Sequence, residues 1–220
     1  MKTKNNFLKL KRYCYSCFVM ALLTISPLLA QDVTSGLKLH YTFEAVTGTL
    51  VTDDSGNGAN GTLNGGATIV TGKDGSAVQF PVLGDYMQLP NDITASLTDF
   101  TFAAWVRMDG SIQTQTRIFD FGASVTSGDP QKYFLLSANG WNGVPRFCIT
   151  TGSWNNEQGV ESNKALPVGT WTHLAVTLQG GTATIYMNGA VVGKAVGWTL
   201  TPSSLGSTDQ NYLAKSQWSG

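Results

Sequence analysis

Apolar and polar residues alternate along much of the chain from Leu37 onwards. Leu37–Phe43 is the first such segment, and alternation with a period of two is typical of a strand with one buried face. Phe100–Met108 is longer and largely apolar, which predicts a central strand. No stretch carries apolar residues at helical spacing over three turns, so the pattern predicts an all-β fold.

Shorter strand-like segments follow at intervals of roughly 8–12 residues, the spacing of a β-sandwich or barrel. Asn188-Gly189 is a strong hairpin signal, because the tight turn needs positive φ at both positions. Asp53–Gly66 is rich in Gly, Asn and Asp and predicts a loop. No Pro- or Ser-rich linker divides the chain, so we expect one domain. Its other predicted strands are Ala77–Phe80, Tyr86–Leu89, Arg117–Phe121, Tyr133–Ser137, Arg146–Thr150, Thr172–Leu178, Ala183–Met187 and Val191–Val192.

The first 30 residues have the pattern of a secretory signal peptide. A basic start is followed by an apolar run from Phe18 to Leu29 and a small residue, Ala30. The run is shorter than the ~20 apolar residues of a membrane span, and no second span follows. We therefore expect cleavage near Ala30, a short linker over residues 31–36, and a protein that is secreted, periplasmic or displayed at the cell surface.

Charge and cysteine content exclude several classes of function. Without the predicted signal peptide the chain keeps all 14 acidic residues but loses five of its 14 basic ones, a net charge of about −5. That balance argues against nucleic acid and anionic membranes as partners. Cys148 is then the single remaining cysteine, and we expect it to be a buried core residue rather than a nucleophile or metal ligand.

Several of these segments, in this order, resemble the laminin-G-like, concanavalin A-like lectin/glucanase family. The resemblance covers roughly residues 37–218 and implies a two-sheet antiparallel jelly-roll sandwich. In that family a further strand follows and pairs beside the first, whereas this sequence stops at Gly220, so we expect the domain, residues 37–220, to lack its final strand. The segments that carry the resemblance are Leu39–Phe43, Asp54–Asn57, Gly61–Leu63, Ala77–Phe80, Phe100–Val106, Trp171–Thr177, Ala183–Gly189 and Asn211–Ser216.

Catalysis is not expected in this chain. The family includes endoglucanases, whose paired acids share one strand with an Asp between them, and this arrangement is absent. Glu157 and Glu161 lie in a Gly- and Asn-rich segment, for which a solvated loop is the simpler interpretation. His40 and His173 have no nucleophile elbow nearby.

A structural Ca²⁺ site is one interpretation of the acidic loop after residue 52. Asp53, Asp54, Asn57 and Asn60 supply the short oxygen ligands that calcium prefers. The alternative is a turn that uses Asp, Asn and Gly for positive φ and side-chain-to-backbone hydrogen bonds. Members of the family that the chain resembles often hold a structural calcium ion, but part of that site commonly comes from the final strand, which this sequence is expected to lack.

Loop aromatics beside amides are the candidates for sugar binding. An aromatic ring offers a flat apolar surface to a sugar, and neighbouring amides offer hydrogen bonds. Trp105 and Trp171, in apolar strands, are expected in the core, whereas Trp198 and Trp218 are further candidates. The predicted ligand-binding residues are Tyr133, Trp141, Asn142, Trp154 and Asn155.

Three functions remain open at the level of sequence. The first is a non-catalytic module that binds an extracellular glycan, similar to modules attached to polysaccharide-degrading enzymes. The second is the amino-terminal part of a glycoside hydrolase whose catalytic domain is not in this sequence. The third is an adhesion domain that binds a protein surface. The oligomeric state does not follow from the sequence.

Overall fold

The computed structural model describes residues 35–110, 113–124 and 130–218. Thr34–Gly220 form one compact unit. The predicted signal peptide, residues 1–30, lies outside the described residues. Among the described residues, no helix has the length and apolar character needed to cross a membrane.

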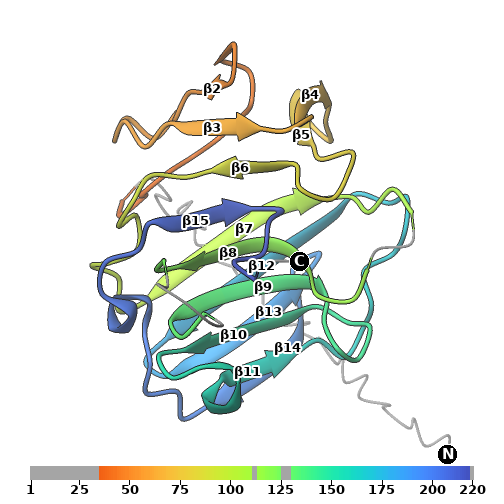
Figure 1. Ribbon diagram of the computed structural model, residues 1–220. Helices are drawn as coiled ribbons and strands as arrows, with labels where there is room; N and C mark the ends of the chain where they lie inside the picture. Colours follow the sequence, from red (N-terminus) through yellow and green to blue (C-terminus); the bar gives the residue numbers. More distant parts are fainter. Residues whose placement is uncertain (1–34, 111–112, 125–129, 219–220) are drawn as a thin grey trace, which may run out of the picture. The chain divides into compact units, whose positions relative to one another are not determined.

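Antiparallel strands form a large sheet and a small one (Figure 1). The large sheet has nine strands in the order β1-β2-β3-β6-β15-β8-β9-β10-β11. A short 3₁₀ turn, η1 (Trp154–Asn156), precedes its last strand. The strands are β1 (Val46–Thr47), β2 (Leu50–Val51), β3 (Gly61–Asn64), β6 (Tyr86–Gln88), β15 (Gln210–Leu213), β8 (Thr116–Gly122), β9 (Tyr133–Asn139), β10 (Arg146–Thr150) and β11 (Gln158–Glu161).

The small sheet has four strands in the order β14-β13-β12-β7, so β7 lies at its edge. A separate two-stranded hairpin is formed by β4 (Thr68–Thr71) and β5 (Ser76–Gln79), and a second 3₁₀ turn, η2, covers Pro202–Leu205. The four strands are β14 (Ala190–Val196), β13 (Thr182–Met187), β12 (Thr172–Gln179) and β7 (Phe100–Val106).

The core lies between the two sheets and is built from alternate residues of their strands. Phe119, Phe134 and Phe147 of the large sheet are fully buried with Leu174 and Ile185 of the small sheet. The phenylalanine rings meet mostly edge to face; the centroids of Phe119 and Phe134, for example, are 5.5 Å apart. The predicted all-β, two-sheet antiparallel jelly-roll sandwich is confirmed.

Most predicted strands are present with small changes at their ends, and Arg146–Thr150 is identical to β10. The Asn188-Gly189 turn joins β13 to β14 with φ values of 50° and 79°, as its residues predict. Within the predicted loop Asp53–Gly66, however, Gly61–Asn64 forms strand β3, which pairs with β2 and β6. The abundance of turn-forming residues led to a loop prediction for this short strand. Its residues Gly-Thr-Leu-Asn alternate in burial, so that Gly61 and Leu63 are buried.

Two strand predictions are wrong in an informative way. Phe100–Met108 was expected at the centre of a sheet, but β7 is an edge strand. Leu37–Phe43 belongs to no sheet, and its main chain bonds instead to the Asp53–Asp54 loop through both side chains and main chain. The His40 amide donates to Asp53 Oδ1 (2.8 Å) and the Thr42 amide to Asp54 Oδ2 (3.0 Å).

Candidate functional site

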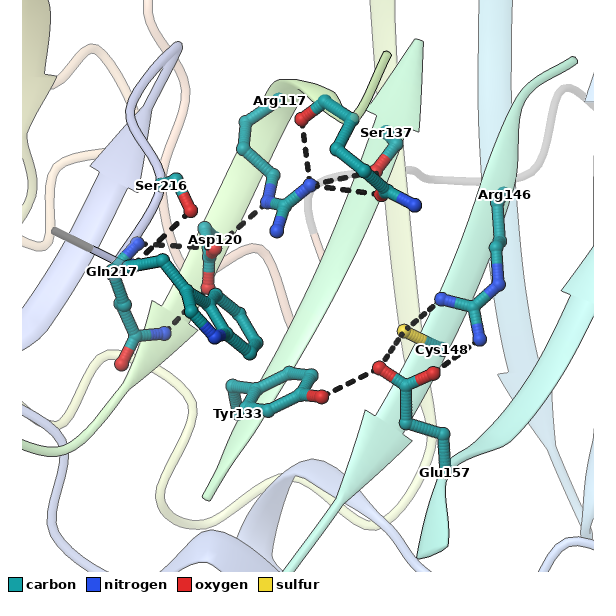
Figure 2. A network of polar contacts seen from close by, with 11 residues as sticks. Arg117, Asp120, Tyr133, Ser137, Arg146, Cys148, Glu157, Ser216 and Gln217 are labelled. Atoms are coloured by element: carbon teal, nitrogen blue, oxygen red, sulfur yellow. Dashed lines mark hydrogen bonds and ion pairs between the residues drawn. The ribbon is translucent and has the colours of Figure 1, made fainter. Parts of the chain in front are cut away.

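Strand register places a band of polar residues on the outer face of the large sheet, away from the core. Asp120 of β8, Leu135 of β9 and Cys148 of β10 are cross-strand partners, so they point to the same side. Ser137 and Arg146 are also partners in the adjacent row. Figure 2 shows the polar side chains of this band in two neighbouring groups of contacts, one around Asp120 and one around Glu157; together we call them the network.

One half of the network is a buried ion pair on β8. Arg117 Nε lies 2.9 Å from Asp120 Oδ2, and both side chains are almost completely buried. The guanidinium also donates to Ser137 Oγ (3.1 Å) and to the Gln115 main-chain oxygen (2.6 Å). Burial raises the pKa of Asp120, while the Arg117 charge and the hydrogen bonds from Arg117 and Gln217 oppose that rise.

The other half gathers around Glu157, which comes from the segment between β10 and β11. Its carboxylate accepts from Arg146 Nη2 and from Tyr133 Oη, the latter at 2.5 Å. Arg146 Nη1 also lies 3.1 Å from Cys148 Sγ. Burial raises the pKa of the Cys148 thiol, and burial followed by the Glu157 contact raises the pKa of Tyr133. Cys148 is thus a buried thiol whose raised pKa disfavours the reactive thiolate.

The carboxy-terminal segment after β15 covers this network. The Trp218 ring meets the Tyr133 ring edge to face at 4.7 Å, and Arg117 Cζ lies 5.5 Å from the Trp218 ring centre. Gln217 donates to Asp120 through its side-chain amide and its main-chain N–H. The network is therefore largely buried, and its acidic and basic side chains pair with one another.

The enclosed network was not predicted from the sequence, and Glu157 was expected in a solvated loop. The signal was present: Arg117, Asp120 and Arg146 are charged residues inside otherwise apolar strands. A charged side chain at such a position is rarely buried unless it is paired. The sequence does not say which partner it has, because Glu157 and Gln217 come from other segments.

The structure divides the predicted ligand-binding residues between the two ends of β10. Trp141 and Asn142 lie in the turn before this strand, and Trp154 and Asn155 lie in η1 after it. Both tryptophan side chains are exposed, 73% for Trp141 and 60% for Trp154. Tyr133 is fully buried beneath Trp218 and presents no open surface to a ligand.

Two other tryptophans also differ from expectation. Trp105 was expected in the core, but its side chain points outward from β7 and is 46% exposed. Trp198, a candidate platform, is buried and stacks on Phe147 with ring centroids 5.2 Å apart. Trp171 is half-buried, and Arg107 Cζ lies 5.1 Å from its ring centre.

The predicted calcium ligands form a hydrogen-bonded turn. Both Asp53 oxygens are occupied, by the amides of His40, Ser55 and Ala59 and by the Ser55 hydroxyl. Asn60 Oδ1 accepts from the Asp53 amide (2.9 Å), and Asn57 Nδ2 donates to the Leu37 oxygen (2.8 Å).

Donors thus point at the oxygens that a cation would need. Among the described residues, no group of three or more His, Cys, Asp or Glu side chains could hold a metal ion. The positive φ of Gly56 (84°) and Gly58 (69°) also matches the turn alternative. The present geometry does not fit a calcium ion, and calcium binding stays a prediction that a titration can test.

A groove of about 450 Å³ lies elsewhere, beside the edge strand β7. Residues His40–Glu44 form part of its lining, and the turn of the β4–β5 hairpin with the start of β5, Lys73–Ala77, forms another part. Ala104, Trp105 and Trp171 complete it. The Lys73 ammonium lies 5.5 Å from the Trp105 ring centre.

The fold and the enclosed polar face define a jelly-roll domain of the lectin and glucanase class. The sequence matches the family described as the concanavalin A-like lectin/glucanases superfamily over residues 82–220, and the chain belongs to this family. A search of curated proteins finds no match.

Solved structures with similar folds come from several kinds of protein. An S-layer domain-containing protein of Clostridium thermocellum is 36% identical, with a TM-score of 0.50 over 74% of this chain and 73% of that one. Domain 4 of the GH43 extracellular arabinanase AbnA from Geobacillus stearothermophilus, solved with arabinotriose, is 22% identical, with a TM-score of 0.63 over 76% and 79%. A sialidase of Trypanosoma rangeli is 12% identical, with a TM-score of 0.54, and this chain covers 27% of it.

Proposed function

We propose that this domain is a non-catalytic carbohydrate-binding module and that the Trp154 ring is its sugar platform. The observation that carries the proposal is a large, exposed aromatic ring next to an exposed amide, Asn155, on a fixed turn. Among the described residues, the Asn155 side chain has no hydrogen-bond partner, so it is available to a ligand. A stiff ring with a free amide beside it suits a sugar.

The turn that carries Trp154 is held in place from several sides. Thr150 Oγ1 donates to the Ser153 oxygen (2.8 Å), and the Ser153 amide donates to the Gln131 oxygen (3.1 Å). Asn156 Nδ2 donates to the Gly152 oxygen (2.6 Å). A platform that is already ordered loses little conformational entropy on binding, which favours affinity.

Trp141, at the other end of β10, is the weaker candidate. Its neighbour Asn142 donates to Glu161 Oε2 at 2.7 Å, so that amide is already engaged within the protein. Five residues of β10 separate the two turns, which corresponds to ~16 Å. One short oligosaccharide therefore contacts one of the two rings, and Trp141 serves as a matched control for Trp154.

The similar domain of an arabinanase, solved with arabinotriose, supports a sugar as the ligand class. A non-catalytic role is supported by the pairing of the acidic side chains on this face of the large sheet. Glu157 pairs with Arg146, and Asp120 pairs with Arg117 beneath the carboxy-terminal segment. A glycosidase needs two carboxyl groups on either side of an accessible glycosidic bond. The basic and apolar start of the sequence supports export to meet an extracellular glycan.

The proposal is tested on a glycan array that includes arabinan oligosaccharides. We expect the wild-type domain to bind at least one glycan, Trp154→Ala to lose about tenfold or more in affinity, and Trp141→Ala to bind like the wild type. Both rings are exposed, so circular dichroism should show that both variants stay folded. Binding retained by Trp154→Ala would remove the proposed platform.

The other two functions predict different outcomes. An adhesion domain for proteins would bind none of the glycans on the array. A catalytic domain would release shorter oligosaccharides from a bound polysaccharide, which chromatography of the reaction mixture would reveal. Either result contradicts a non-catalytic carbohydrate-binding module.

A further inference from the structure

A lysine side chain lies against two tyrosine rings on the outer face of the large sheet, where β6 and β15 lie side by side (Figure 1). Met87 and Leu213 face the core, so the neighbouring Tyr86 and Tyr212 face outward. The Lys215 ammonium lies 4.1 Å from the ring centre of Tyr86 and 4.6 Å from that of Tyr212. The two rings meet edge to face, with centroids 5.3 Å apart. These contacts hold the ammonium in place and leave its charge available.

The main chain turns sharply just before Lys215. Ala214 has a φ of 66°, in the left-handed region that residues with a Cβ atom rarely occupy. Its amide donates to the Ile118 oxygen (3.1 Å), which fixes the turn at the end of β15. Strained main-chain conformations of this kind cluster at functional sites. The turn therefore marks the lysine that follows it as a candidate for function.

Neutral amides continue the outward-facing surface of the same strands. Asn64 of β3 is the cross-strand partner of Tyr86, and Gln88 of β6 is the partner of Tyr212. The amide nitrogens of Asn64 and Gln88 donate to main-chain oxygens. Their amide oxygens have no partner in the described part of the chain, so they can accept hydrogen bonds from a ligand.

The ammonium has no acidic partner among the residues that the structure describes. Asp120 and Asp209 lie near enough to Tyr212 for their charges to act on its hydroxyl, but both are engaged elsewhere. Asp120 pairs with Arg117, and Asp209 accepts from the Ser124 amide and hydroxyl. An anionic group of a ligand would therefore be the counter-ion that this lysine lacks.

We propose that Lys215, held by Tyr86 and Tyr212, is the centre of a second sugar site that takes a glycan with carboxylate groups, such as a polymer of uronic acid. The ammonium pairs with a carboxylate, and the sugar hydroxyls donate to the amide oxygens of Asn64 and Gln88. The half-buried Tyr86 ring offers an apolar contact. An inorganic anion matches the ammonium but brings no hydroxyl donors for the two amide oxygens.

This site is separate from the Trp154 platform. β8 and β9 lie between β15 and β10, so three strand spacings, ~14 Å, separate Tyr212 from the strand that leads to Trp154. The inference rests on the proposed function only in that the ligand is a sugar. It adds a class of ligand, acidic glycans, which the Trp154 ring and the Asn155 amide do not select.

The test is calorimetric titration of the domain with hexamers of galacturonic acid and of mannuronic acid. We expect at least one hexamer to bind. Its methyl ester, which has the same sugars without the negative charges, should bind about tenfold more weakly, because the charge-assisted contact with Lys215 is lost. Inorganic sulfate at the same concentration should not displace the hexamer.

Four protein variants localise the binding. Lys215→Gln should weaken it about tenfold, and Lys215→Arg, which keeps the charge, should retain it. Lys194→Gln makes the same change of net charge on an exposed lysine of the small sheet and should bind like the wild type. Trp154→Ala should also retain binding of the acidic hexamer, which keeps this inference distinct from the proposed platform.

Three results would overturn the inference. One is that neither hexamer binds, and another is that the methyl ester binds as tightly as the acid. The third is an equal loss in Lys194→Gln and Lys215→Gln, or displacement by sulfate, since either would show attraction of any anion instead of recognition of an acidic sugar. Melting temperatures of the variants check that each remains folded.

Discussion

The centre of the sandwich and the side beside β7 are built from similar apolar residues, but their side chains are buried to different degrees. At the centre, Phe119 and Phe134 are fully buried, and even the outer face of β9 is covered by Trp218. Beside β7, Phe102 and Phe80 keep part of their surface in solvent. Burial depends on having neighbours on every side, and β7 has a strand on one side only.

The largest expected effect is a loss of stability, and it differs between two phenylalanines, one from each region. Phe119→Ala removes a ring that contacts five other phenylalanine rings and should cost about 4 kcal/mol of unfolding free energy. Phe80→Ala, on the open side, should cost about 1–2 kcal/mol, because its ring is already partly hydrated. Urea unfolding measures both, and equal losses would contradict the difference between the regions.

The next effect tests the enclosed polar network. Asp120→Leu leaves the Arg117 guanidinium buried without its counter-ion and should cost about 3 kcal/mol. The double variant Arg117→Met/Asp120→Leu should recover most of that loss, since an apolar pair of similar volume needs no partner. If the single and double variants unfold at the same urea concentration, the ion pair does not hold this face together.

A smaller effect concerns the Asp53–Asp54 loop, which holds residues Leu37–Phe43. Burial alone would raise the pKa of Asp53, but hydrogen bonds from Ser55, His40 and Ala59 outweigh it and lower the pKa to about 2. A lowered pKa stabilises the folded state above the ordinary pKa of 3.8, and this stabilisation is lost as the pH falls towards 2.

Between pH 4 and pH 2 the wild type should therefore lose about 2 kcal/mol that Asp53→Asn does not lose. Urea unfolding at a series of pH values measures the difference. Parallel curves for the two proteins would show that the Asp53 hydrogen bonds contribute nothing.

The smallest effect is the one expected from calcium. Because donors occupy the Asp53 and Asn60 oxygens, adding calcium or a chelator should leave the melting temperature unchanged within about 1 °C. A clear rise with calcium, absent in Asp53→Asn, would instead restore the predicted calcium site and show that this turn rearranges around the ion.

Much of the fold could be predicted from the sequence, because apolar and polar residues alternate within each strand of a sandwich. Arg146–Thr150 and the Asn188-Gly189 turn needed no information from distant residues. The position of a strand within a sheet is different, because it depends on which other strands pair with it. Phe100–Val106 is apolar enough for a central strand and is nevertheless an edge strand.

The candidate sites were harder to predict for the same reason. Trp141 and Trp154 were correctly expected to be loop residues, but nothing local says that β10 separates them. Tyr133 looks like a platform in the sequence and is buried because Trp218, 85 residues later, lies on it. Partners that are distant in sequence decide which aromatic rings remain open.

The most direct test of the proposed function follows the six tryptophan side chains during ligand binding. The indole N–H resonances of a ¹⁵N-labelled domain are assigned by single substitutions and recorded while the glycan identified on the array is added. We predict that the Trp154 resonance shifts in proportion to occupancy, while those of buried Trp198 and distant Trp141 stay in place. A Trp154 resonance that does not move at saturating glycan would contradict the account.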